Sequence, residues 1–454
     1  MKTKHVFSAA AFGLGLVFAA PAPAARAASG EVREAVQARV AAEFASLEAI
    51  YKQLHANPEL AFQEFETAAL LAKELRALGI EVTEKVGNTG VVGVLKNGDG
   101  PTVLLRADMD GLPVKELVDL PWASKAVKKD LAGKEVPTMH ACGHDLHVTG
   151  LIGAARTLVA LKERWRGTIV FVGQPAEEIV SGARAMLTDG LYTRFPRPDF
   201  ALGLHVFSHF PAGLVGYTEG PAYASSWAVD VVVRGVGGHG SAPHTTKDPV
   251  VLAAQIVLGL QTIVSREIQP GVPAVVTVGS IHGGTKRNII GEEVKLELTL
   301  RGYEDKVMEH LVASIRRMCD GLGRAAGVPE DRLPVVVLQK EGANVTVNTP
   351  ELTRKLAGTF REWFGAGRVE PVPPITGAED FSEYGRTVHR VPAVIWTVGA
   401  GDPAAIAAAK QAGKSVPTNH SPDVRFLHDP TLQTCVISLA AAALELMPAR
   451  GVER

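Results

Sequence analysis

The sequence predicts an α/β protein with two units. The main unit has a mostly parallel sheet flanked by helices, and a smaller ferredoxin-like α+β unit is inserted into it. Three observations predict this arrangement. Strand-like β-branched runs alternate with helical patterns in the first half of the chain. A β-α-β-β-α-β order follows in the middle. The 454 residues also exceed what one ordinary domain holds.

The main unit is predicted to open with an amphipathic helix, because apolar residues recur at helical spacing from Val32 to Leu54. A second helix, from about 64 to 78, stops at Gly79, a residue type that commonly ends helices. Strands and helices then alternate. The expected strands are 102–105, 168–172 and 200–204, and the expected helices are 147–162 and 182–187.

The inserted unit is predicted from a change in pattern near Gly220 and Pro221. In order, it contains a strand (228–234), a helix (248–265), two strands (275–281 and 294–300), a helix (304–326) and a last strand (335–338). This is the split β-α-β pattern of ferredoxin-like domains. We assign residues 221–333 to the inserted unit.

The main unit, 29–220 and 334–454, is expected to resume with a helix at 351–364, a strand at 393–398 and a closing helix at 430–446. The Ala- and Gly-rich stretch 399–413 is expected to be a surface loop.

Residues 1–28 resemble a secretory signal. Lys2 and Lys4 precede an apolar stretch, and Ala25-Arg26-Ala27 offers a small-x-small cleavage pattern. The apolar stretch is shorter than the ~20 residues of a spanning helix, which favours a cleaved signal over a membrane anchor. We expect an exported protein, periplasmic or secreted, with no other segment long and apolar enough to span a membrane.

Composition excludes other classes. Hydrophobic residues make up 46% and charged residues 21%, which is typical of a soluble globular protein. The net charge of -1, without a Lys/Arg tract, gives no support to nucleic-acid binding. Three cysteines are too few for a disulfide-stapled scaffold. Cys319 and Cys435 lie among apolar residues and are expected to be buried core thiols.

The third cysteine lies in the densest chemical pattern of the chain. Cys142 and His144 flank a glycine just before a predicted helix, and His140 and Asp145 adjoin them. A thiolate and an imidazole one residue apart can face the same cation. An ordinary loop is the weaker reading of this pattern.

Other ligand-type side chains follow the carboxyl ends of predicted strands. Glu177 and Glu178 follow 168–172, His205 follows 200–204, and Asp108 and Asp110 follow 102–105. Sites in open α/β sheets gather at this edge. Taken alone, the two glutamates would be a solvated loop, but their position favours a metal site. In this reading one of them binds metal and the other faces a water molecule. His420, in a late loop, could complete the ligand set.

These motifs together resemble the amidohydrolase branch of the M20 metallopeptidases, which includes hippurate hydrolases, aminoacylase-like enzymes, indole-acetyl amino-acid hydrolases and carboxypeptidases. The resemblance covers nearly the whole mature chain. Its motifs are LLRADMDGLP (104–113), MHACGHDLH (139–147), QPAEE (174–178), GLHV (203–206), GGHGSAPH (237–244), GAEDF (377–381) and NHSPD (419–423).

The resemblance implies two divalent metal ions, with zinc favoured and manganese, cobalt or nickel as alternatives. It implies that Glu177 is the general base and that Asp110 orients a ligand. In other M20 branches an Asp bridges the ions at the position of Cys142, so this thiolate is expected to bridge them here. The implied ligands are Cys142, His144, Glu178, His205 and His420.

For the inserted unit, the resemblance implies a lid and dimerisation domain. His239 would polarise the scissile carbonyl, often in the other subunit, so a homodimer or higher oligomer is expected. Asn288 and Arg301 would contact the substrate carboxylate, although a turn histidine and a surface arginine remain alternatives. Lys286 and Arg287 before Asn288, and a long segment at 122–137, depart from the family pattern.

The expected function is hydrolysis of the amide bond of N-acyl amino acids or small peptides with a free carboxylate, by a metal-bridged water with Glu177 as base. Two alternatives remain. One is an exported metal- or peptide-binding protein without turnover. The other is a deacetylase of a diamino acid or an amino sugar. Serine-hydrolase chemistry fits less well, because the chain has no G-x-S-x-G motif.

Overall fold

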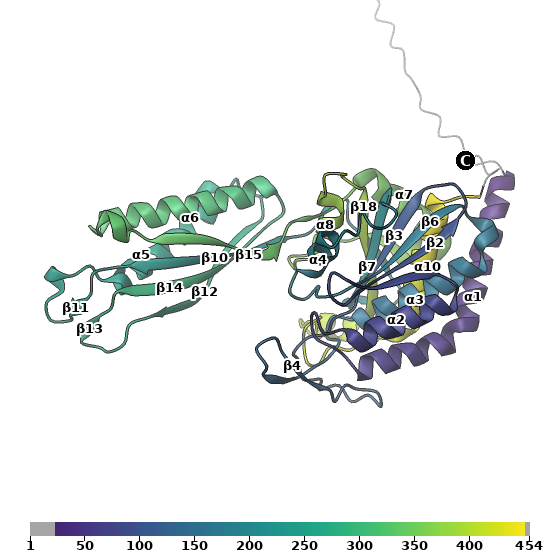
Figure 1. Cartoon of the computed structure of the whole chain (residues 1–454), viewed down its shortest axis with the longest axis horizontal. Helices are drawn as coiled ribbons and strands as arrows, with labels where there is room; N and C mark the ends of the chain where they lie inside the picture. Colours follow the sequence, from purple (N-terminus) through teal and green to yellow (C-terminus); the bar gives the residue numbers. More distant parts are fainter. Residues whose placement is uncertain (1–22, 450–454) are drawn as a thin grey trace, which may run out of the picture.

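A computed structural model describes residues 23–449 (Figure 1). Most of the predicted signal segment, residues 1–22, lies outside the described residues, so the signal stays a prediction. Within the described chain the two expected units are distinct (Figure 1). One is a helix-flanked sheet, and the other is a smaller α+β unit that extends from it.

The main unit is built on an eight-stranded sheet. Its four central strands, β6, β3, β7 and β18, run parallel, and the outer β1, β2 and β8 join antiparallel. This confirms the predicted mostly parallel α/β sheet. The order is β1 (Glu81–Val86), β2 (Gly90–Asn97), β6 (Gly167–Gln174), β3 (Thr102–Asp108), β7 (Phe200–Pro211), β18 (Ala393–Gly401), β8 (Val215–Tyr217) and β17 (Val369–Pro371).

Alternate residues of the central strands supply two cores. In β3, Val103 and Leu105 join one apolar cluster, whereas Leu104 joins another. Neighbouring side chains of a strand point to opposite faces, so both faces of this sheet are covered. The first face carries α1 (Pro23–Ala56), α2 (Phe65–Ala77), α3 (His144–Ala160), α7 (Pro350–Phe364) and α10 (His428–Leu446), and the second carries α4 (Gly182–Thr188) and α8 (Ser382–Arg386).

The small unit has a four-stranded antiparallel sheet in the order β12, β14, β10, β15. Two helices pack on it around a separate apolar core. This is the ferredoxin-like arrangement. The elements are β10 (Ser225–Arg234), α5 (Pro249–Thr262), β12 (Ala274–Gly283), β14 (Glu293–Gly302), α6 (Asp305–Ala325) and β15 (Val335–Ala343). The last strand, β15, lies beyond residue 333, where the inserted unit was predicted to end. The domain boundary at 333 remains a proposal.

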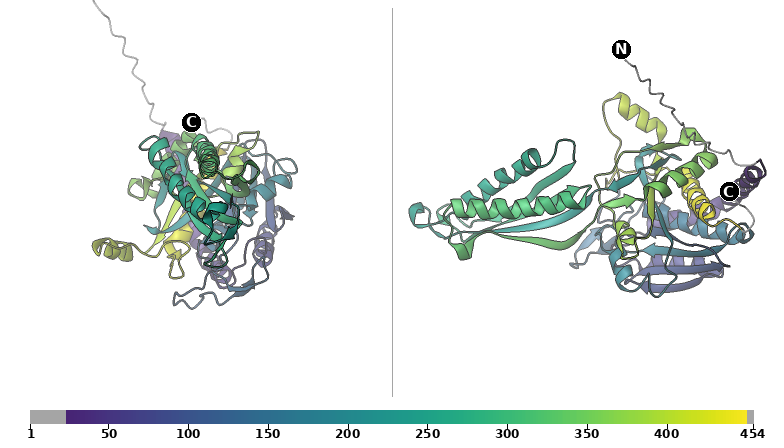
Figure 2. Two further views of the ribbon diagram at one scale, coloured as in Figure 1. Left: turned by 90° about the vertical axis from the view of Figure 1, so that its left-hand side faces the viewer. Right: turned by 90° about the horizontal axis from the view of Figure 1, so that it is seen from above.

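Two expectations about single segments were wrong. The stretch 399–413 is not a plain loop, since it contains the end of β18 and the helix α9 (Pro403–Gln411). The Asp402 side chain accepts a hydrogen bond from the Ala404 amide (2.8 Å), and Pro403 opens the helix, so an N-cap signal was overlooked. Figure 2 shows α9 as the yellow-green helix that stands away from the main unit.

The second correction concerns membrane-length segments. The helix over Pro249–Glu267 is long and apolar enough to cross a bilayer by length and composition, contrary to expectation. One of its faces, with Leu252, Ile256 and Leu260, is buried in the core of the small unit. The core helices of globular proteins pass the same test, so this is weak evidence for a span.

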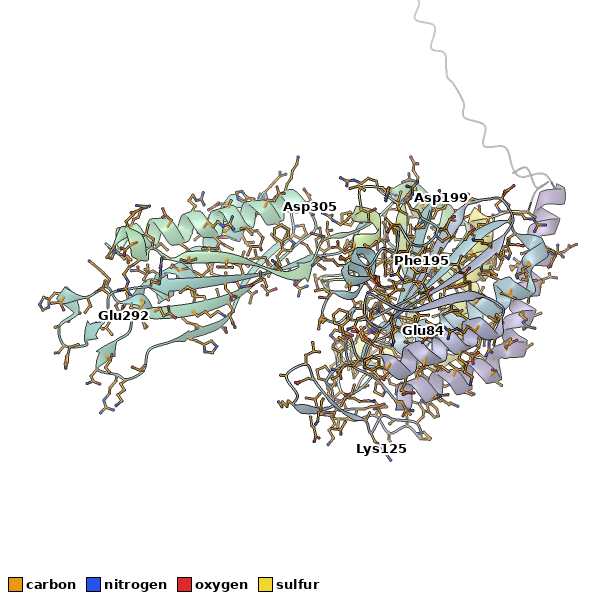
Figure 3. All side chains as sticks on the ribbon, viewed as in Figure 1. Glu84, Lys125, Phe195, Asp199, Glu292 and Asp305 are labelled. Atoms are coloured by element: carbon orange, nitrogen blue, oxygen red, sulfur yellow. The ribbon has the colours of Figure 1, made fainter. Side chains whose placement is uncertain are left out.

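The small unit meets the main unit at one end only (Figure 1). There, Arg386 of α8 pairs with Asp305 at the start of α6 (2.6 Å), and β9 (Gly220–Tyr223) pairs with β16 (Thr346–Asn348). Figure 3 labels Asp305 at this end and Glu292 towards the other. The free tip of the small unit carries the short strands β11 (Gly238–His239) and β13 (Ile289–Ile290).

The long segment at 122–137 contains a small hairpin of β4 (Val127–Lys129) and β5 (Glu135–Pro137). Its base is tied to the main unit where Leu112 and Met139 exchange backbone hydrogen bonds. Beside it, the Leu117 amide donates to the Pro422 carbonyl at 2.9 Å, two residues after His420. The segment that leads into the hairpin is therefore tied to the loop that carries His420.

Candidate metal centre

Two strand ends, the middle of a third strand and one helix start meet at the carboxyl edge of the central sheet. β3 ends at Asp108 and β6 ends three residues before Glu177. His205 was predicted to follow a strand end, but it lies midway along the longer β7, just beyond the residues that pair with β3. The helix α3 begins at His144, directly after Gly143. Gly143 has a positive φ (85°), and a Cβ there would meet Val206 Cγ2 at 2.3 Å. Only glycine allows this close turn.

The five predicted ligands lie together at this edge. Cys142 Sγ is 3.4 Å from His205 Nε2 and 3.2 Å from His420 Nε2. His420 Nε2 is 3.4 Å from Glu178 Oε2, and His144 Nε2 is 3.9 Å from Glu178 Oε1. Cys142 belongs to two groups of three ligand-type residues, one with His144 and His205 and one with Glu178 and His420. The site therefore contains two adjacent donor sets that share a thiol.

The donor atoms fit cations. His144 Nε2 and Glu178 Oε1 are buried and have no hydrogen-bond partner among the described residues. Buried polar atoms without partners are rare in folded proteins, and a bound cation would satisfy both of these. His144 Nδ1 donates to the Asp110 carbonyl (2.8 Å), and His205 Nδ1 donates to the Val206 carbonyl (2.9 Å). These bonds orient both Nε2 atoms towards the shared space.

Asp110 fixes the segment that carries the two glutamates. Its carboxylate accepts hydrogen bonds from the backbone amides of Glu177 (3.0 Å) and Glu178 (2.9 Å). On either side, Ala176 (φ 51°) and Val180 (φ 48°) adopt the left-handed conformation. This conformation costs about 1–3 kcal/mol for residues other than glycine and persists only where the surroundings enforce it. Asp110 supplies part of that constraint.

Glu177 lies beside the donor sets in a carboxylate-rich pocket. Its side chain is buried, and Glu177, Glu379 and Asp380 form a further group of adjacent ligand-type atoms. Burial raises the pKa of Glu177 well above its usual range, and the negative charges of Glu379 and Glu178 raise it further. A carboxyl group with a raised pKa can both accept and return a proton near neutral pH.

A buried arginine holds these carboxylates in place. Arg106 contacts Asp108 (2.6 Å), Glu379 (2.7 Å) and Asp380 (3.3 Å), with its side chain fully enclosed. Opposite charges and charge-assisted hydrogen bonds offset the cost of burying these groups. Neither Arg106 nor the acidic pair at 379–380 was among the residues predicted from the sequence. The adjacent acids were visible in GAEDF, but nothing in the sequence linked them to Arg106.

A histidine behind the donor sets was also missed. His147 Nδ1 hydrogen-bonds Asp108, and its Nε2 accepts from the Val206 amide (2.9 Å). It thereby links β3, α3 and β7 behind the site. Its position one helical turn after His144, on the same helix face, was the available signal.

The residues predicted in the small unit are not brought to this site within one chain. His239 and Asn288 are neighbours at the free tip, where the Gly240 amide donates to the Asn288 carbonyl (2.9 Å) (Figure 1). His239 Nδ1 accepts from the Ser241 hydroxyl (2.7 Å), which leaves its Nε2 available. Arg301 lies at the other end of β14, near the main unit, and is half-buried. Their roles stay predictions.

Comparisons with known proteins agree with this geometry. Residues 104–415 match the family model described as peptidase family M20/M25/M40. The chain is 37% identical over 354 residues to thermostable carboxypeptidase 2 of Saccharolobus solfataricus, covering 77% of this chain and 84% of that protein. It is 37% identical over 336 residues to hippurate hydrolase of Campylobacter jejuni, covering 74% and 83%.

Among solved structures, the YXEP protein of Bacillus subtilis, described as a dinuclear metal-binding peptidase of the M20 family, superposes with a TM-score of 0.72. That match has 27% identity and covers 89% of this chain and 98% of the other. The matched segment holds four of the five clustered donors and Glu177, and His420 follows five residues after it. The chain is therefore a member of the M20/M25/M40 peptidase family, and it is a metal-dependent amidohydrolase or peptidase.

Proposed function

We propose that this protein hydrolyses the amide bond of N-acyl amino acids or small peptides that carry a free carboxylate. The observation that carries the proposal is the convergence of two three-residue donor sets beside the buried Glu177. The names of two relatives support the substrate class. A carboxypeptidase cuts next to a free carboxylate, and hippurate is itself an N-acyl amino acid.

Two divalent ions held by Cys142, His144, Glu178, His205 and His420 would lower the pKa of a water and polarise the amide carbonyl. Thiolate and imidazole donors favour zinc, whereas the carboxylate also admits manganese, cobalt or nickel. Glu177 accepts a proton from the attacking water and delivers it to the leaving nitrogen. Asp110 keeps that carboxylate in position through the backbone amides that it binds.

Substrate recognition by the free carboxylate gives the first prediction. A panel of N-acyl amino acids and dipeptides, offered to the metal-loaded protein, is expected to include substrates. For the best of them, conversion of the free carboxylate to an amide is expected to lower kcat/KM more than about tenfold, because a lost hydrogen bond to a charged group costs about 1.5–3 kcal/mol. The amine that hydrolysis releases, measured with ninhydrin, gives the rate for each panel member and for the amidated form of the best substrate.

Other results on this panel would support the alternatives. Binding of substrates without cleavage would support a binding protein. Cleavage of N-acetyl amino sugars or diamino acids alone would support the narrower deacetylase. Equal rates for free and amidated carboxylates would exclude carboxylate recognition.

We also propose that the active form is a homodimer in which His239 serves the site of the partner subunit. The distance between the tip of the small unit and the donor sets of the same chain supports this (Figure 1). The mature protein would act after export, as the Lys2-to-Ala27 pattern indicates.

The dimer proposal predicts complementation between two inactive variants. Each of Glu177→Gln and His239→Ala alone should be nearly inactive. Subunits mixed and allowed to exchange should regain about a quarter of wild-type activity, because half of the dimers are mixed and each has one intact site. Steady-state hydrolysis before and after exchange measures this. Activity that does not recover, in mixtures shown to contain mixed dimers, would contradict a role for His239 across subunits.

A further inference from the structure

Tyr223 has a buried hydroxyl that no contact in its surroundings explains. The residue ends β9 and is only 4% exposed. Its hydroxyl oxygen has no hydrogen-bond partner among the described residues. Leaving such a group unpaired costs about 1–3 kcal/mol, so a phenol persists there at a disadvantage to phenylalanine. Two other buried tyrosines differ, because Tyr192 donates to the Tyr384 carbonyl (3.0 Å) and Tyr384 donates to Gln174 (2.9 Å).

The Tyr223 ring lies beside the donor sets. Its centroid is 6.4 Å from that of His205 and 6.5 Å from that of Phe207. Its backbone is fixed from two sides, by the pairing of Tyr223 with Thr346 and by a bridge to Ile375. The backbone of Tyr223 is held on both sides, and its side chain has only two rotatable torsions. The ring therefore has little freedom, and its hydroxyl is held in one place.

The hydroxyl can donate a hydrogen bond to a molecule in the site. A phenol has an ordinary pKa of about 10, so the Tyr223 hydroxyl carries its proton at neutral pH. No acceptor among the described residues lies within hydrogen-bond distance of it. The hydroxyl is therefore free to donate to a group that enters the site.

We propose that Tyr223 is a catalytic residue whose hydroxyl donates a hydrogen bond to the carbonyl oxygen of the scissile amide, more strongly as that oxygen becomes negative. The inference rests on the proposed amide hydrolysis. A donor already oriented towards developing charge stabilises the transition state more than the ground state. A carbonyl oxygen has two lone pairs, so this donor and His239 of a partner subunit can act on the same atom.

The test is Tyr223→Phe in the full chain. We expect kcat to fall about 100-fold while KM stays within about twofold. This is the usual effect of removing one hydrogen-bond donor to the oxyanion of a transition state. Affinity for a phosphinate analogue of the best substrate, with its negative tetrahedral oxygens, should fall about 100-fold, whereas affinity for the product amino acid should not change. Metal content should be unchanged. The midpoint of thermal unfolding should be unchanged or higher, because the deleted hydroxyl has no partner in the protein.

Tyr192→Phe is the matched control. It removes a buried hydroxyl that has a protein partner, so it should lower the unfolding midpoint and leave kcat unchanged. For Tyr223→Phe, unchanged kcat with unchanged phosphinate affinity would overturn the inference. So would a lower midpoint with lost metal, which indicates a structural role. If the wild type cleaves no member of the panel, the proposed function fails and the inference about Tyr223 fails with it. If the wild type cleaves its best substrate but binds the phosphinate no more tightly than the product, the inference fails and the proposed function stands.

Discussion

Replacement of Glu177 by glutamine is expected to lower kcat about 1000-fold with little change in KM and with the metal content retained. The amide has nearly the shape of the carboxylate but cannot accept a proton. Glu177 groups with Glu379 and Asp380, and also with His144 and Glu178, but it belongs to neither donor set that contains Cys142. The substitution therefore removes proton transfer and leaves the metal ligands in place.

Glu178→Gln is the matched comparison, because it changes the neighbouring carboxylate in the same way. Glu178 lies 3.4 Å from His420 and has a buried oxygen without a partner, so its loss should reduce metal binding as well as activity. Metal analysis and steady-state kinetics on both variants separate the two roles. Full activity in Glu177→Gln, or metal loss in that variant alone, would reverse the assignment.

The sequence could predict the donor sets because each donor lies at a position that the chain order already fixes. The central strands run parallel, so Asp110, Glu178 and His205 had to emerge at one edge. Cys142 precedes, and His144 begins, a helix that packs on those strands. His420 was harder to place, because a late loop carries no such constraint. Only its place in the family motif indicated that it reaches Cys142.

The remaining parts of the site depend on contacts between distant segments, which no local pattern encodes. Arg106 lies in a buried strand of mostly apolar residues, and its partners Glu379 and Asp380 follow about 270 residues later. Tyr223 is a single aromatic residue in a short strand, where an ordinary core residue is the default reading. The tip position of His239 depends on how far the small unit extends, and sequence periodicity does not give that length.

The second large effect is expected at Cys142. Its sulfur is the donor common to both three-residue groups, so its loss weakens both at once. Changes to residues that merely support a ligand already cost 10–100-fold in metal affinity, so Cys142→Ala should cost more than about 100-fold. Activity should fall to near background at metal concentrations that saturate the wild type.

Cys319→Ala and Cys435→Ala are the controls, because both thiols are also buried but lie in apolar clusters away from the donor sets. Each should retain full metal content and activity with a modest loss of stability, since a small cavity costs about 1 kcal/mol. Metal stoichiometry after dialysis measures all three variants. The five donors come from four separate segments, and Cys142 is the one cysteine in the ligand groups found in the described part of the chain. A Cys142→Ala protein that still bound two ions tightly would therefore mean that the donors do not act as one centre.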